Sequence, residues 1–296
     1  TVLRGGEVTG VCNPREESNA SLSRLMIGAE PPALTHHERT PGEVLFETVN
    51  LSLEKEDQFG ADLHGINLQV RSGEVVGIAG VSGNGQRELL YALSGEDTRA
   101  PSQAIQLLQQ DVGHLDAHER RQVGMHFVPE ERLGRGAVPT LSLAQNMLLT
   151  RSEAIAQSGW IDTNTLQAQA QKVIDRFNVK ANGPQAAAQS LSGGNLQKFI
   201  VGREIDAKPK VLLVSQPTWG VDVGAAAQIR AELLALRDAG CAVLVVSEEL
   251  DELFEICDRL YVMANGKLSP SIDRKKASVA QIGEWMSGLW ESHAEA

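Results

Sequence analysis

The sequence is poor in cysteine, in positive charge and in long apolar runs. Its three cysteines, Cys12, Cys241 and Cys257, have the spacing of neither a metal site nor a redox pair, so a reducing compartment fits better than a disulfide framework. The formal net charge of −11 disfavours a nucleic-acid-binding protein, because that affinity comes mainly from clustered Lys and Arg. No apolar run approaches the length that crosses a bilayer, so we expect any membrane role to come through a partner.

A weak internal repeat links the two ends of the sequence. Residues 2–8, which predict half of a hairpin, are similar to residues 261–268, and residues 25–28 (LMIG) are similar to residues 285–288 (WMSG). Both pairs lie roughly 260 residues apart, which indicates the tail of a first repeat at 1–28 followed by a complete second one. Two unrelated hairpins are the alternative explanation.

The segment 29–43 predicts a linker. The stretch from Glu30 to Gly42 contains three prolines, two histidines and no apolar periodicity. We therefore expect residues 44–288 to form the second unit and residues 289–296 to form a C-terminal tail. With 42% hydrophobic residues, the chain has enough apolar side chains to bury a sizeable core.

Apolar patterns in the second unit predict an α/β fold. Alternation at 44–53 and 63–70 favours antiparallel strands, and the apolar run 75–79 predicts a buried strand that leads into a glycine-rich loop and a helix. Continuous apolar runs typical of buried parallel strands occur at 211–214 and 242–246. The segment from 141 to 190 is rich in Ala, Gln and Leu and predicts a helical insertion.

The glycine-rich loop has the spacing of a phosphate-binding loop. Residues 80–87, GVSGNGQR, keep the glycines of G-x-x-x-x-G-K-[ST] but have Gln86 for Lys and Arg87 for Ser or Thr. Backbone amides at the start of the helix can still face a phosphate. Losing the Lys removes a charge-assisted bond of about 1.5 to 3 kcal/mol, and losing the hydroxyl removes a magnesium ligand. A plain strand-to-helix turn is the alternative. The candidate phosphate-binding residues are Gly80, Ser82, Gly83, Asn84, Gly85, Gln86 and Arg87.

A second glycine turn occurs at residues 191–198, LSGGNLQK. Leu196, Phe199 and Ile200 fall on one face of the helix that follows, so Ser192 is placed to cap the helix while the glycine amides point outward. An anion is the natural partner of such a helix end, although a glycine loop that only caps a structural helix is the alternative. The candidate ligand-binding residues are Leu191, Ser192, Gly193, Gly194, Asn195 and Gln197.

The octapeptide LSGGNLQK resembles the signature motif of ATP-binding-cassette (ABC) ATPases. The resemblance implies an α/β P-loop NTPase fold with a mixed core sheet, an antiparallel β subdomain and an inserted helical signature subdomain at about 139–195. Cassettes of this family pair head to tail, so that the signature of one covers the ATP held by the phosphate loop of the other.

Other family positions are altered in this sequence. The resemblance places Ser215 and Gln216 where the family has Asp-Glu, which support Mg²⁺ and polarise the attacking water, so the expected catalytic position at Gln216 is impaired. Glu248 stands at the position of the switch histidine, and Glu130 at the Q-loop glutamine; both carboxylates have an alternative explanation as ordinary solvated residues. Asp222 matches the D-loop aspartate.

The altered residues would all belong to one composite site, whereas the signature and Asp222 would serve the opposite one. Residues 83–86, 129–132 and 215–218 resemble the second cassette of tandem ATPases from bacterial importers of simple sugars and nucleosides. Trp219 departs from the Arg common in these relatives. No tyrosine occupies the adenine-stacking position, and Phe59 is the candidate that remains.

This resemblance implies the cofactors and partners. ATP and Mg²⁺ would be held mainly at the composite site with a first cassette of the same polypeptide. The other partners would be integral-membrane permease subunits and, indirectly, an extracytoplasmic solute-binding protein, with the ATPase at the cytoplasmic face of the bacterial inner membrane. Neither a nucleic-acid partner nor a dedicated protein metal site is expected.

Two other functions compete with this interpretation. One is a regulatory or scaffold domain that keeps the fold and binds nucleotide weakly or not at all. The other is an ABC ATPase that acts on ribosomes or DNA, which the acidic balance disfavours.

Overall fold

The centre of the molecule is a mixed sheet built around five parallel strands. The computed structural model describes residues 1–4, 7–13, 17, 21, 36–37, 39–151, 156–157 and 160–290. The sheet order is β14-β13-β5-β12-β11-β8, with β15 paired to β13. Its strands are β5 (Val75–Ala79), β8 (Met125–Val128), β11 (Val211–Ser215), β12 (Ala242–Ser247), β13 (Arg259–Ala264), β14 (Lys267–Leu268) and β15 (Ile272–Asp273). Pairing of β13 with β14 and β15 is antiparallel, and the other pairs are parallel.

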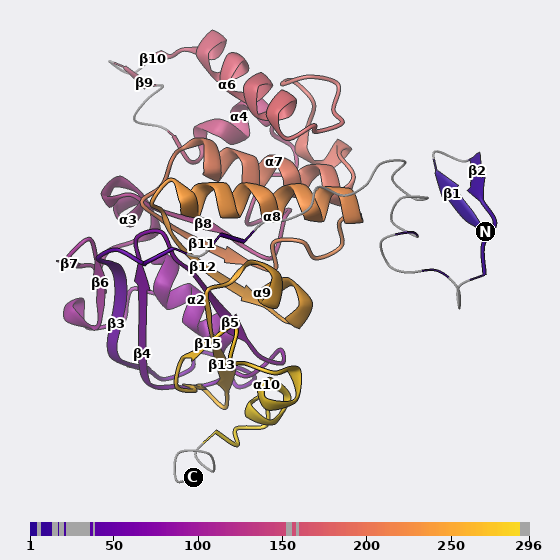
Figure 1. The fold of residues 1–296 in the computed structure, drawn as a ribbon. Helices are drawn as coiled ribbons and strands as arrows, with labels where there is room; N and C mark the ends of the chain where they lie inside the picture. Colours follow the sequence, from indigo (N-terminus) through magenta and orange to yellow (C-terminus); the bar gives the residue numbers. More distant parts are fainter. Residues whose placement is uncertain are drawn as a thin grey trace.

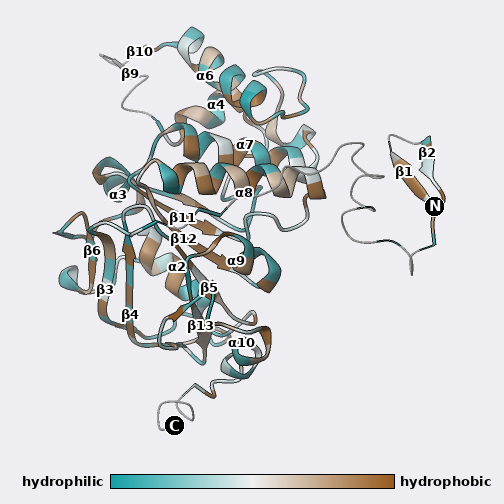
Figure 2. Cartoon of the chain, viewed as in Figure 1, coloured by the Kyte–Doolittle hydropathy of each residue, from teal (hydrophilic) through white to brown (hydrophobic). Residues whose placement is uncertain are grey.

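Successive residues of the central strands face two separate cores. In β5, Val76 and Ile78 pack toward the antiparallel sheet, whereas Val75 and Ala79 pack toward the helices on the other side. Every residue of β5, β11 and β12 is buried, and in Figure 2 this part of the chain is predominantly brown, the colour of hydrophobic residues. The continuous apolar runs of the sequence are thus confirmed as strands buried on both faces.

An antiparallel sheet covers one side of the central sheet. Its order is β4-β3-β6-β7, formed by β3 (Val44–Leu53), β4 (Leu63–Arg71), β6 (Ile105–Leu107) and β7 (Gln110–Asp111). Figure 1 shows it at the lower left, with α2 (Gln86–Ser94) lying behind it against the central strands. The predicted antiparallel pair of strands at 44–53 and 63–70 is confirmed.

Helices cover the other side and form a layer above it (Figure 1). Within the predicted insertion, α4 (Leu143–Leu148), the short hairpin β9 (Ala156–Gln157) and β10 (Trp160–Ile161), and α6 (Thr163–Arg176) precede the single turn η2 (Ala188–Ser190). The helices that pack on the sheet or follow it are α7 (Gly193–Asp206), α8 (Val223–Asp238), α9 (Leu250–Ile256) and α10 (Val279–Trp285). The turn η1 (Ser102–Ala104) and α3 (Ala117–Val123) connect the two sheets.

A buried charge cluster joins α7 to α3 and β8. Glu204 is fully buried and contacts Arg121 at 2.5 Å, His126 at 2.7 Å and Arg203 at 2.8 Å. Burial alone would raise the pKa of Glu204, but the charges of Arg121 and Arg203 and the hydrogen bond with His126 outweigh it and hold that pKa well below its usual range. Arg203 also donates to the carbonyls of Gly136 and Asn146.

The N-terminal strands form a hairpin of their own. β1 (Val2–Arg4) pairs with β2 (Glu7–Gly10), so the strand at residue 2 has a partner within the chain. Residues 25–28, on which half of the proposed repeat rests, lie outside the described residues, as do most of 29–38 and all of 291–296.

In the part of the chain that the structure describes, no helix combines the length and the apolar character that a membrane span requires.

Candidate functional site

The phosphate-loop segment has the backbone of a strand-loop-helix turn. It leaves β5 at Ala79 and enters α2 at Gln86, and Gly83 and Gly85 have φ angles of +87° and +107° that side chains rarely adopt. A Cβ on Gly80 would lie 2.7 Å from the carbonyl oxygen of Met263. These three glycines are therefore required by the local geometry, as their spacing predicted.

Gln86 folds back into this loop. Its Nε2 donates to the carbonyl of Val81 at 2.9 Å, and its Oε1 accepts a hydrogen bond from the amide of Asn84 at 3.1 Å. Asn84 Nδ2 also donates to the Val81 carbonyl, at 2.9 Å. One of the amides that a phosphate would use is thus bonded within the loop, and a nucleotide would have to displace a bond of about 0.5 to 1.5 kcal/mol.

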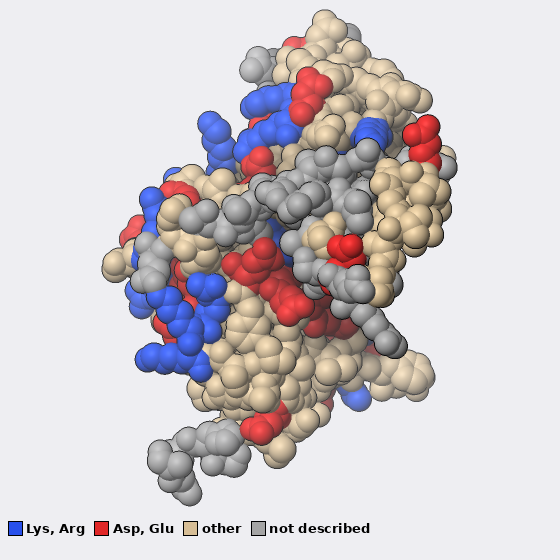
Figure 3. All heavy atoms as spheres, turned by 45° about the vertical axis from the view of Figure 1, so that its right-hand side comes forward, with Lys and Arg blue, Asp and Glu red and all other residues tan. Residues whose placement is uncertain are grey.

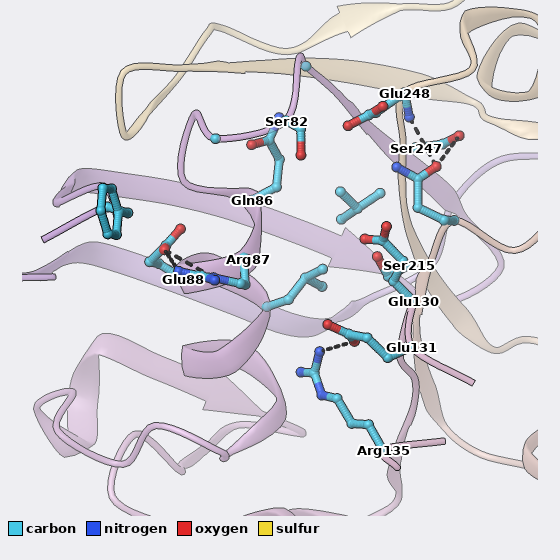
Figure 4. A pocket seen from close by; sticks show the side chains of 16 residues that line it. Ser82, Gln86, Arg87, Glu88, Glu130, Glu131, Arg135, Ser215, Ser247 and Glu248 are labelled. Atoms are coloured by element: carbon cyan, nitrogen blue, oxygen red, sulfur yellow. Dashed lines mark hydrogen bonds and ion pairs between the residues drawn. The ribbon is translucent and has the colours of Figure 1, made fainter. Parts of the chain in front are cut away.

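Arg87 does not take the place of the missing lysine. Its Nη2 contacts Asp57 at 2.9 Å and Glu88 at 3.1 Å, outside the loop. The hydrogen bond with Glu88, together with the charges of Glu88 and Asp57, outweighs partial burial and raises the pKa of Arg87. Figure 4 shows Arg87 beside Glu88 rather than beside Ser82 and Gln86. Its charge is therefore balanced by two carboxylates instead of facing a phosphate.

A cavity of about 250 Å³ opens beside the loop. Figure 4 shows the loop on one wall and the carboxylates of Glu130, Glu131 and Glu248 on the other. The lining residues that the sequence pointed to are Gly80, Ser82, Gly83, Gln86, Arg87, Glu130, Ser215, Gln216 and Glu248, and Phe59 also contributes. The structure thus brings the altered residues together around one space.

The electrostatics of this cavity oppose a polyphosphate. Burial, followed by the negative charges of Glu131 and Glu248, raises the pKa of Glu130. Glu131 also loses hydration, but the hydrogen bond and the charge of Arg135 lower its pKa. Arg135 forms ion pairs with Glu96 and Glu131. Among the described residues, neither Glu130 nor Glu248 has a cationic partner in an ion pair. Two such carboxylates would repel the charges of ATP.

The end of β11 lacks the groups for metal binding and for catalysis. Gln216 has a φ of +47°, and its Oε1 accepts from the Ser247 hydroxyl at 3.4 Å and from the amide of Glu248 at 3.3 Å. The side chain is thereby turned toward β12, and neither Ser215 nor Gln216 offers a carboxylate to Mg²⁺ or a base to water. The residues present therefore do not fit Mg-ATP in a hydrolysing arrangement, and we derive no catalytic step in this cavity.

The signature turn is presented to solvent. Ser192 occupies the N-cap position of α7, but its hydroxyl makes no capping bond and instead accepts from Asn195 Nδ2 at 2.9 Å. This corrects the expected side-chain cap: Asn195 holds the hydroxyl, and its own Oδ1 accepts from the amide of Lys180. Ser192 and Gly193 are exposed. The helix end therefore keeps its outward amides for an external acceptor.

Two other predicted ligand residues have structural roles in this chain. Gln197 is buried; its Oε1 accepts from Arg132 and its Nε2 donates to the carbonyl of Pro217, so both polar atoms of this predicted ligand residue are bonded within the chain. Asp222 caps α8 by accepting from the amide of Ala225 at 2.9 Å. Leu191 packs against the helical core.

The signature turn and the cavity are separate surfaces. All of residues 191–198 are described, and none of them lines the cavity. Sequence reasoning missed Glu88, Glu131 and Arg135, which also line it; the run of charges after Pro129 was the available signal. It also missed Glu252, which is buried beneath the site and accepts from Thr218 at 2.6 Å and from Ser247 at 2.9 Å.

Comparisons with known proteins identify the family that the chain matches. The family model described as "ABC transporter" matches residues 63–219. The chain is 35% identical to the nucleoside import ATP-binding protein NupA of Lactococcus lactis and 32% identical to the ribose import ATP-binding protein RbsA of Halalkalibacterium halodurans. Each alignment covers 97% of this chain, but 57% and 56% of the relative. The chain thus spans about half the length of the curated relatives that it matches.

Solved structures share the fold. A nucleotide-free ATP-binding cassette from an ABC transporter matches with a TM-score of 0.65 at 22% identity, covering 78% of this chain and 92% of the other. A dimeric cassette in a post-hydrolysis state, bound to ADP and Pi, matches with a TM-score of 0.67 at 20% identity, covering 78% and 99%. The predicted fold class, a mixed sheet with an antiparallel β part and helical parts, is confirmed.

Proposed function

We propose, from the premise that this chain belongs to the ABC transporter family, that it is the second cassette of a tandem ATPase that energises import of simple sugars or nucleosides. The names of its relatives support this solute class, since they include import proteins for nucleosides, ribose and glucose. Those relatives are nearly twice as long as the matched region, which leaves room in them for another cassette. Residues 1–28 would then be the end of the first cassette and 29–43 the linker.

The observation that carries the proposal is the contrast between two surfaces of one chain. The signature turn at Ser192 has an open helix end, while the cavity beside Gln86 has no carboxylate at Ser215 or Gln216 for Mg²⁺ or water. Among its described lining residues, Arg87 and Arg135 are both paired with carboxylates. A cassette of this kind supports hydrolysis in a neighbour's site and not in its own.

The signature turn would act on the ATP of the first cassette by electrostatics. Ser192, Gly193 and Gly194 place a hydroxyl and backbone amides at the positive end of α7, which has 14 residues. Such fixed dipoles stabilise the negative charge of a phosphate without reorganising during the reaction. Mg²⁺ and ATP would be held by the first cassette, because the groups that bind them are absent beside Gln86.

Permease subunits would meet this cassette at a second hollow. It has a volume of about 180 Å³ and is lined by Phe127, Arg135, Leu149 and Thr150, among others. Leu149 is exposed although it is apolar, which suits contact with another protein. By this proposal the membrane subunits would contact the cassette here, at the cytoplasmic face of the inner membrane. An extracytoplasmic solute-binding protein would act through those subunits.

On the face in Figure 3, Lys and Arg side chains lie among Asp and Glu side chains rather than as one basic stripe. This distribution and the net charge of −11 favour a partner other than nucleic acid. Copurification with an integral-membrane permease separates the transporter from the remaining candidates.

A regulatory or scaffold domain is the second candidate function. The internal hydrogen bonds of Gln86 and the pairing of Arg87 with Asp57 and Glu88 favour it, because they occupy the Asn84 amide and the charge of Arg87 without nucleotide. Paired substitutions of Ser192 and Gln86 in the tandem protein distinguish the two candidates: a transport ATPase loses activity when Ser192 is replaced, whereas a scaffold has none to lose.

Weak nucleotide binding by this chain is a direct expectation of the cavity's chemistry. Replacing Gln86 with Lys frees the Asn84 amide and restores a cation, so Mg-ATP affinity should rise by one to two decades, on the order of 1.5 to 3 kcal/mol. Isothermal titration calorimetry of the wild-type and Gln86→Lys chains measures the change. Tight binding by the wild-type chain, unchanged by the substitution, contradicts this account of the cavity.

A further inference from the structure

Arg132 bridges three segments that meet at the signature turn. It lies in the loop after β8, where the amides of Gly136 and Ala137 donate to the carbonyls of Glu131 at 2.9 Å and Arg132 at 2.7 Å. These bonds close the loop and fix the backbone of Arg132. Arg135, in the same loop, lines both the cavity beside Gln86 and the hollow proposed for the permease.

The guanidinium of Arg132 reaches the other two segments. Its Nε donates to Gln197 Oε1 in the first turns of α7 at 3.1 Å, and its Nη2 donates to the carbonyl of Trp219. The group also lies 5.5 Å from the centre of the Trp219 ring, within the range of a cation–π contact. Gln197 completes the connection by donating to the Pro217 carbonyl at 3.1 Å. One planar group thus joins the signature helix to the loop 217–220.

Two glycines make room for this arrangement. A Cβ on Gly193 would lie 2.7 Å from Nη1 of Arg132, and a Cβ on Gly220 would lie 3.3 Å from Nη2. Gly220 also has a φ of +61°. The glycine of the signature and the glycine of the 217–220 loop are therefore both packed against the same guanidinium.

Arg132 is not held by an ion pair. Among the ion pairs of the described residues, Arg135 contacts Glu96 and Glu131, but Arg132 has no carboxylate within 4 Å. Burial lowers the pKa of Arg132. Its contacts are an amide oxygen, a carbonyl and an aromatic face, all of which depend on the planar fork of arginine rather than on charge alone.

We propose that Arg132 is a positioning residue that aligns the signature turn and the loop 217–220 with the loop after β8. A movement of that loop caused by the permease would then be transmitted through this side chain to the signature turn, which contacts the ATP held by the first cassette. The inference rests on the proposed function, because it assigns Arg132 a role in the composite site. Trp219 belongs to the same arrangement, since its ring and its carbonyl both contact the Arg132 guanidinium.

The test uses the tandem ATPase assembled with its permease. Arg132→Lys keeps the charge but loses the fork, and Arg132→Gln loses both. We expect either variant to lower kcat for ATP hydrolysis by about tenfold or more, because small misplacements of reacting groups have large effects on rate. KM for ATP should change by less than about threefold, since ATP is held by the first cassette. Trp219→Leu, at an exposed position, should lower kcat by about threefold and be non-additive with Arg132→Lys.

Arg176→Lys is the matched control. Arg176 lies 5.3 Å from the Phe177 ring, so it shares the aromatic contact of Arg132 away from the signature turn, but its polar partner is the carboxylate of Glu232 at 2.7 Å. Its replacement should leave kcat within about twofold. Full activity of Arg132→Lys together with loss in Arg132→Gln would overturn the proposal, because charge alone would then suffice. Full activity of both variants would also overturn it.

Failure of the inference is distinguishable from failure of the proposed function. If Ser192→Glu abolishes hydrolysis but the Arg132 variants do not lower it, the composite site stands and the positioning role is wrong. If Ser192→Glu has no effect either, the proposed function is wrong. Thermal unfolding of each variant identifies any loss of the folded state, and Trp219→Leu retains a readout should the Arg132 variants unfold.

Discussion

In the proposed tandem ATPase, replacing Ser192 with glutamate is expected to lower ATP hydrolysis on the order of 10²-fold or more. Ser192 is exposed at the start of α7, and its hydroxyl contacts only Asn195 among the described residues, so the substitution leaves the core untouched. A carboxylate suits the positive end of a helix and should not unfold it. It would, however, stand where the phosphate of the neighbour's ATP has to approach. Steady-state hydrolysis by the assembled transporter measures the effect.

Gln86→Ala is the matched comparison. It removes two hydrogen bonds within the phosphate loop and no group that supports hydrolysis, so we expect activity within about twofold of wild type. If the signature turn supports hydrolysis and the cavity does not, Ser192→Glu must lower activity far more than Gln86→Ala. Equal loss from both would mean that the cavity beside Gln86 also hydrolyses ATP.

The largest effect on stability is expected at Glu204. Glu204→Gln leaves Arg203 buried and Arg121 half-buried without their counter-charge, and breaking a buried pair in this way costs about 3 to 5 kcal/mol of unfolding free energy. Urea unfolding of this chain at neutral pH should therefore show a lower midpoint in the variant. Glu232→Gln removes a carboxylate from an exposed pair with Arg176 and should change the unfolding free energy by about 1 kcal/mol or less.

The effect of Glu204 should depend on pH. Because its pKa in the folded state lies below the ordinary value of 4.5, the carboxylate contributes stability that is fully present above that value and is lost as the pH falls below it. The difference between wild type and Glu204→Gln should therefore be largest near neutral pH and shrink in acid. A difference that grows as the pH falls would contradict the charge assignment.

The sequence predicted the framework of the fold because its strands leave strong local patterns. The alternation of β3 and β4 and the continuous apolar runs of β5, β11 and β12 each indicate how a strand is buried, and all were found. The loop at Gly80 was recognisable because a tight turn into α2 needs glycines at fixed spacing. Element bounds were less exact: β4, β11 and β12 each extend one residue beyond the predicted runs 63–70, 211–214 and 242–246.

The side-chain arrangement of the site was beyond the sequence. Arg87 contacts Asp57, which lies 30 residues away in the chain, and only the folded backbone brings the two together. The polar atoms of Gln86 could bond to a ligand or to the loop. No sequence pattern predicts its hydrogen bonds with Val81 and Asn84. Gln197 was expected at the nucleotide because it belongs to the signature motif. In the folded chain it lies on the buried face of α7, where it accepts a hydrogen bond from Arg132.

Hydrolysis by this chain alone, with and without Gln216→Ala, is the most direct measurement. At the end of β11 the catalytic position is an amide, Gln216, which cannot act as a base and is bonded toward Ser247 and Glu248. We predict no turnover of Mg-ATP above background, and no change on substituting Gln216. Brisk hydrolysis that is abolished by Gln216→Ala would contradict the account, because it would show that the chain cleaves ATP in its own cavity.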